Sequence, residues 1–185
     1  LADPALPREA LEPALSKSAL VGFADAKTGL EVARRLGLRP DGRAGEAARL
    51  AVRALGRTHG AGAVDALLDM LGWYPADSAL RGDVVAALDA KRADLLVFRR
   101  PEARTALEDA LRTETAHPAR MLVLVRLAAD YGPEQASALA RLSTHPDAEV
   151  LVVAAEGLAR LKAPEAARRV IPELEAVVAG ALNDP

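Results

Sequence analysis

The sequence predicts an all-α protein, a right-handed α-solenoid of four to five stacked helical hairpins. Three observations lead to this prediction. Hydrophobic residues make up 51% of the chain but aromatic residues only 3%, so Ala, Leu and Val would fill the core, and Ala and Leu favour helices. Apolar residues recur at three- and four-residue steps, as on one helical face. Similar segments also return after 31 or 32 residues, a spacing typical of helical repeats.

Residues 1–42 are predicted to form irregular helices that cap the stack. The segment "DAKTGLEVARRLG" indicates a helix that Asp25 caps and that ends near Gly37. A degenerate hairpin is expected here because a terminal repeat has one face against water. Prolines and glycines are expected to interrupt the rest of this part, namely Pro7, Pro13, Gly22 and Gly29.

Four hairpins are predicted to follow in one continuous domain, at 43–72, 77–114, 117–143 and 147–182. The repeat is clearest in "GPEQASALARL" and "APEAARRVIPE", where Pro133 precedes Pro164 by 31 residues. Asp147 is expected to cap the last hairpin's first helix. Pro172 lies inside its second helix and is expected to kink it, because proline cannot donate a backbone hydrogen bond.

Two of these units resemble HEAT repeats of the short bacterial kind. The resemblance rests on "DAEVLVVAAEGLARLKAPEAARRVIPEL" and "RALGRTHGAGAVDALLDML", which follow the family's order of an apolar helix, a turn with Pro or Gly, and a second helix with spaced leucines. The units at 77–114 and 117–143 are similar only loosely. The resemblance implies an armadillo-like binding scaffold and implies no particular activity.

Composition excludes several classes of function. The chain has no cysteine, which excludes disulfides, thiolate metal sites and a cysteine nucleophile. A formal net charge of −2 argues against a nucleic-acid partner. No apolar run approaches the roughly 18 residues of a membrane span. A cytoplasmic location is favoured, and a periplasmic or secreted one stays open because a signal peptide could have been removed before Leu1.

Two motifs suggest a ligand but have simpler explanations. The segment "GRTHGAG" at 56–62 lacks the Gly-Lys-Ser/Thr ending of a phosphate loop, so we interpret its glycines as a helix C-cap and a tight turn. His117 and His145 precede neighbouring repeats, but a metal site there would need further ligands, such as Glu114 and Asp147. Surface-loop histidines are the favoured interpretation. No metal, cofactor or catalytic residue is predicted.

Arg49, Arg53 and Arg57 form a possible anion-binding stripe, because four-residue spacing puts them on one side of a helix. Seven Arg against three acidic residues give residues 31–60 a charge of +4. The stripe falls on the first helix of its hairpin, which in such stacks usually faces outward. Aromatic residues for stacking on bases are also scarce. A solvated outer face is therefore favoured.

The second helices of the hairpins are predicted to carry a partner-binding face. If Leu67, Leu107, Leu139 and Val170 are equivalent core positions, residues two places away point outward. Second helices of such stacks line a concave surface that commonly binds partners. The candidates pass from acidic to basic along the stack: Asp65, Asp69, Thr105, Asp109, Ser137, Arg141 and Arg168. This pattern indicates a polarised groove for a partner of complementary charge, with chance as the alternative.

Trp73 and Tyr74 lie in a longer connection, "WYPADSA" at 73–79. They are expected to cover the seam between two repeats, and an exposed interface anchor is the alternative.

We therefore favour a non-catalytic scaffold or adaptor that binds a peptide or protein on its concave helical surface. One alternative is an enzyme or accessory enzyme on a HEAT-like scaffold, similar to DNA glycosylases or tetrapyrrole lyases. A cleft with a buried, perturbed carboxylate and aromatic side chains, or a strongly basic groove, would favour that alternative. Another is a structural repeat module of a larger protein, which an open apolar surface on a terminal helix would favour.

Overall fold

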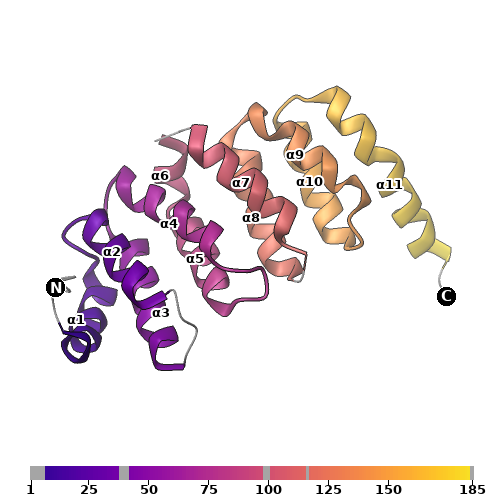
Figure 1. Ribbon diagram of the computed structural model, residues 1–185. Coiled ribbons are helices and arrows are strands. Elements are labelled where there is room, and N and C mark those ends of the chain that lie inside the picture. Colours follow the sequence, from indigo (N-terminus) through magenta and orange to yellow (C-terminus); the bar gives the residue numbers. More distant parts are fainter. Residues whose placement is uncertain (1–6, 38–41, 98–100, 116, 184–185) are drawn as a thin grey trace. The chain divides into compact units, whose positions relative to one another are not determined.

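The computed structural model describes residues 7–37, 42–97, 101–115 and 117–183. Within these ranges every regular element is helical, with eleven α-helices and two short 3₁₀ helices (Figure 1). The all-α prediction is confirmed. The chain divides into two compact units, unit 1 (Leu1–Phe98) and unit 2 (Arg99–Pro185).

Unit 1 contains six helices in two layers. They are α1 (Arg8–Val21), α2 (Ala26–Gly37), α3 (Gly42–Arg57), α4 (Ala61–Trp73), α5 (Ala79–Ala90) and α6 (Arg92–Val97). In one layer α3 packs against both α1 and α5, and in the other α4 packs against both α2 and α6. Consecutive helices from α2 onward also pack on each other. Odd- and even-numbered helices therefore form separate layers, as expected for stacked hairpins.

Unit 2 follows the same alternation. Its elements are α7 (Pro101–Thr113), α8 (Pro118–Tyr131), the 3₁₀ helix η1 (Pro133–Gln135), α9 (Ala136–Ala140), the 3₁₀ helix η2 (Arg141–Thr144), α10 (Ala148–Arg160) and α11 (Pro164–Asn183). In one layer α8 packs on α10, and in the other α9 packs on both α7 and α11. The exposed faces of α7, α9 and α11 therefore belong to the same layer.

The N-terminal helices are more regular than predicted. The prediction that Pro13 interrupts the chain is wrong, because α1 continues through it. Leu15 is fully buried two residues later, and this packing offsets the one backbone hydrogen bond that proline removes. Asp25 caps α2 as predicted. Its carboxylate accepts hydrogen bonds from the backbone and hydroxyl of Thr28, each at 2.8 Å, and these bonds lower the pKa of Asp25.

Gly22 and Gly29 have different roles. Gly22 ends α1 with φ 90°, a left-handed conformation that favours glycine. Gly29 lies inside α2, so the expected interruption is wrong there too. A Cβ atom at Gly29 would lie 2.5 Å from the Phe23 ring and 2.6 Å from the Leu55 side chain. Gly29 therefore permits close packing of these two buried side chains against α2.

The four predicted hairpin ranges contain different numbers of helices. Helices α3 and α4 cover 43–72, and α10 and α11 cover 147–182. The range 77–114 instead contains three helices, α5, α6 and α7, and the division between the two units falls within it. In 117–143 the second segment is short, with α9 flanked by η1 and η2.

The four predicted core positions are confirmed, since Leu67, Leu107, Leu139 and Val170 are each 0% exposed. The last two positions are 31 residues apart, so both residues at this repeat spacing are buried. Helix α11 continues from Pro164 to Asn183 through the exposed Pro172. Pro172 therefore lies on the solvent side of α11, where the loss of its backbone N–H disturbs the packing of the helix least.

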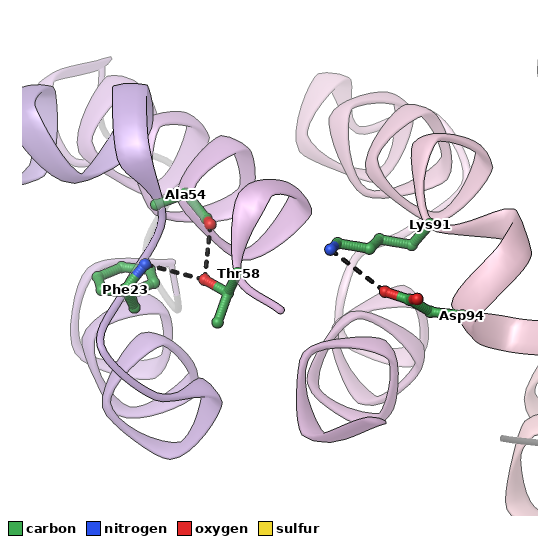
Figure 2. Close-up of polar contacts among 5 residues, drawn as sticks. All are labelled: Phe23, Ala54, Thr58, Lys91 and Asp94. Carbon is green, nitrogen blue, oxygen red and sulfur yellow. Dashed lines mark hydrogen bonds and ion pairs between the residues drawn. The ribbon is translucent and has the colours of Figure 1, made fainter. Parts of the chain in front are cut away.

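Buried polar groups join neighbouring helices of unit 1. The hydroxyl of Thr58 accepts a hydrogen bond from the Phe23 N–H at 2.9 Å and donates one to the Ala54 carbonyl at 2.8 Å (Figure 2). The buried Lys91 ammonium at the end of α5 lies 3.3 Å from the Asp94 carboxylate of α6 (Figure 2). These contacts satisfy groups that would be costly to bury without a partner.

Candidate functional site

A cavity of about 360 Å³ lies in unit 2. Its walls come from the C-terminal end of α7, the start of α8, the α9–η2 segment and the residues before α10. Buried apolar side chains form the floor: Leu111, Met121, Ala138 and Leu142. Polar side chains also line it: Arg112, Glu114, Thr115, Arg141, Thr144 and His145. An apolar floor with a few polar groups is the usual composition of a ligand pocket.

Arg141 is the predicted partner-binding residue that lies at this cavity. It is the first residue of η2, and its side chain is exposed. Among the residues that the structure describes, none forms an ion pair or hydrogen bond with its guanidinium. The other cation in the lining, Arg112, is held by Asp109 at 2.8 Å. Arg141 is therefore the cation available to an anion at the cavity.

Glu114 is the buried charge of the cavity wall. The residue is only 1% exposed, and its Oε1 atom lies 3.9 Å from Arg120 Nη1. A buried carboxylate needs a nearby positive charge, because desolvation penalises the ionised form. The described lining contains no Phe, Tyr or Trp side chain. Of the features that would favour the enzyme alternative, the described wall thus has a buried carboxylate but lacks these aromatic side chains.

His145 is fixed by the turn that precedes α10. Its Nδ1 atom accepts a hydrogen bond from the Asp147 N–H at 3.1 Å, so the neutral ring carries its proton on Nε2. Asp147 in turn caps α10, as predicted, accepting from the backbone of Glu149 and Val150. Within the described ranges no three His, Asp or Glu side chains gather as a metal site would require.

The other partner-binding candidates are divided between the two units. Asp65 is half-buried and Asp69 exposed on α4 of unit 1. Thr105, Asp109, Ser137 and Arg168 are exposed on α7, α9 and α11 of unit 2. Since α9 packs on both α7 and α11, the unit 2 candidates share one layer with Arg141. The acidic character of Asp109 is reduced by its ion pair with Arg112.

Two arginines of the predicted anion-binding stripe, Arg49 and Arg57, bond to neighbouring helices of unit 1. The Arg49 Nε atom lies 3.3 Å from Asp83 of α5, and Arg57 donates a 2.8 Å hydrogen bond to the Leu20 carbonyl at the end of α1. Arg53, between them, is exposed. Two of the three guanidinium groups thus already have partners, which leaves less positive charge for an external anion.

Only one glycine of the 56–62 segment lies in the turn. Gly60 precedes α4 with φ 98°, whereas Gly56 and Gly62 lie inside α3 and α4. A Cβ atom at Gly56 would lie 3.2 Å from Ala87, and one at Gly62 would lie 3.1 Å from Ala26. The C-cap and turn interpretation is therefore wrong for these two glycines, which allow close packing between helices.

Tyr74 is buried and Trp73 half-buried at the end of α4. Burial raises the pKa of Tyr74. Nearby, the buried Arg81 donates hydrogen bonds to the Leu71 and Tyr74 carbonyls, both at 3.1 Å. Arg81 thus satisfies carbonyls at a helix C-terminus, a role that sequence reasoning missed because it depends on how α4 and α5 pack.

Comparisons with protein-family models, curated proteins and solved structures find no match to this chain. The likeness to HEAT repeats therefore rests on the repeated sequence pattern alone. Of the helices in the described ranges, none has both the length and the apolar character needed to cross a membrane.

Proposed function

We propose that this protein is a non-catalytic scaffold or adaptor that binds an acidic peptide segment of another protein. The binding face would be the exposed side of α7, α9 and α11 in unit 2. The observation that carries the proposal is Arg141, an exposed cation with no partner among the described residues, at the edge of an apolar-floored cavity. Complementary charge would orient the segment and speed its association.

The other candidates on this face extend the same surface. Thr105 and Ser137 supply hydroxyl groups, and Arg168 supplies a second exposed positive charge on α11. Helices that pack on each other hold these groups at fixed positions, which reduces the entropy lost when a partner binds. The face therefore suits a segment that places its carboxylates near Arg141 and Arg168.

We further propose that the hairpins of both units follow one another in a right-handed solenoid. The alternation of helix layers within each unit supports this arrangement, as does the 31-residue spacing of equivalent core positions. The acidic pair Asp65 and Asp69 would then form the opposite end of the polarised surface. Small-angle X-ray scattering tests this proposal, because a compact, spherical particle would contradict a solenoid.

Selection of a random peptide library on the full chain tests the binding proposal. Acidic sequences should be enriched, and the double variant Arg141→Glu/Arg168→Glu should bind them at least about tenfold more weakly. The matched control is Arg126→Glu, the same charge change at an exposed position of α8 in the other layer. Selected peptides without acidic character, or equal losses in both variants, would contradict the proposal.

A further inference from the structure

The cavity of unit 2 has the size and composition to receive one side chain. Its volume of about 360 Å³ lies within the range of about 300 to 1,000 Å³ found for ligand pockets. Leu111, Met121 and Ala138 line it and are almost fully buried, and Ala138 contributes only a methyl group. An apolar group placed there would leave water and make dispersion contacts with these side chains.

The polar groups at the cavity favour a negative charge beside that apolar group. Arg141 offers a guanidinium without an ion-pair partner in the described ranges, and Thr144 offers a hydroxyl. His145 carries its free ring proton on Nε2, because Nδ1 already accepts from Asp147. All three can donate hydrogen bonds. The one carboxylate of the lining, Glu114, is buried beside Arg120 and so does not set the charge at the opening.

We infer that this cavity is a specificity pocket for a large apolar side chain, such as leucine, directly next to an aspartate or glutamate in the bound segment. The inference rests on the proposed peptide-binding function and names the partner's sequence chemistry. The apolar side chain fills the cavity over Ala138, while the neighbouring carboxylate contacts Arg141. A lysine or arginine beside the apolar residue would meet the guanidinium and be rejected by charge repulsion.

Capped synthetic peptides test the pocket on the full chain. The probe has a central leucine flanked by aspartates in a Gly-Ser background, with acetylated and amidated ends to remove terminal charges. Replacing its leucine by alanine should weaken binding about 10- to 100-fold, from the apolar burial lost. Replacing its aspartates by asparagines should weaken binding to the native chain but have little further effect in the Arg141→Gln variant.

Two variants of the chain test where the leucine binds. Ala138→Leu fills the cavity from its floor, and Thr144→Met fills it from an exposed position if the first variant fails to fold. In either variant the leucine and alanine peptides should bind within about threefold of each other, because the pocket is occupied. Ser143→Met is the control, since Ser143 neighbours Thr144 but does not line the cavity.

The outcomes separate this inference from the function on which it rests. If the leucine and alanine peptides bind the native chain equally, or if the filled variants still distinguish them, the pocket inference is overturned. Binding of acidic peptides to Arg141 would survive that result and continue to support the proposed function. If no peptide of this series binds, the inference is overturned, and the random library then decides the proposed function independently.

Discussion

Replacing Thr58 by valine should destabilise unit 1 while hardly changing side-chain shape. The Thr58 hydroxyl is the acceptor for the buried Phe23 N–H, at 2.9 Å, and it donates to the Ala54 carbonyl at 2.8 Å (Figure 2). Valine leaves the amide without a partner, which costs about 1–3 kcal/mol. The added methyl group recovers about 0.8 kcal/mol of apolar burial. A net loss of up to about 2 kcal/mol in the free energy of unfolding is therefore expected.

Denaturant unfolding followed by the fluorescence of Trp73, the only tryptophan in the sequence, measures that loss. Thr58→Ser is the matched control, because it keeps the hydroxyl and removes only a methyl group, at a cost of about 0.8 kcal/mol. Hydrogen exchange at the Phe23 amide separates the two effects. The valine variant should exchange faster there and the serine variant should not. Equal protection of Phe23 in both variants would refute the hydrogen-bond reasoning.

Three further predictions concern single positions. Tyr74→Phe should leave stability at neutral pH unchanged or raise it by up to about 1 kcal/mol, because the buried hydroxyl has no hydrogen-bond partner in the described ranges. Burial raises the pKa of Tyr74. The contribution of the protonated Tyr74 to folding stability is therefore fully present below the unfolded-state pKa of about 10 and is lost as pH rises above it. Thermal melts at increasing pH should show a smaller loss of stability in Tyr74→Phe than in the native chain. Gly157→Ala should lower the free energy of unfolding, measured by thermal unfolding, by about 1–3 kcal/mol, since the added Cβ would lie 2.8 Å from the Cβ of Ala129. As a control, Gly180→Ala should raise it by up to about 1 kcal/mol, because a Cβ at Gly180 meets no atom within 4 Å. Asp147→Ala should lower the free energy of unfolding of unit 2 by about 1 kcal/mol, as measured by circular dichroism. Asp147→Asn should lower it much less, because asparagine can still cap α10.

The features predicted well from sequence are those set by local chemistry and periodicity. Asp25 and Asp147 cap helices as expected, because a cap involves only residues a few places away in the chain. The apolar periodicity and the 31-residue spacing predicted that Leu139 and Val170 are buried, and both are. Pro13 was misjudged because proline limits a helix only when packing does not hold the turn around it.

The candidate site was predicted only in part. Arg141 was found from its place two residues after the core position Leu139. The cavity beside it brings together residues 111–115, Met121 and residues 138–146, so no spacing in the sequence reveals it. The burial of Glu114 was missed for the same reason, because it depends on Arg120 and on the neighbouring helices. Likewise, the partners of Arg49 and Arg57 lie in other helices, which the four-residue spacing does not reveal.

The alternation of helix layers has a consequence for how each unit folds. Within each unit, α-helices that pack together are at most two places apart in the order of α-helices, as with α3 and α5 or α8 and α10. Tertiary contacts thus join residues close in sequence, and closing short loops costs little entropy. Helical proteins with such local contacts fold within microseconds to milliseconds. Each unit should therefore reach its native structure quickly, without waiting for distant parts of the chain to meet.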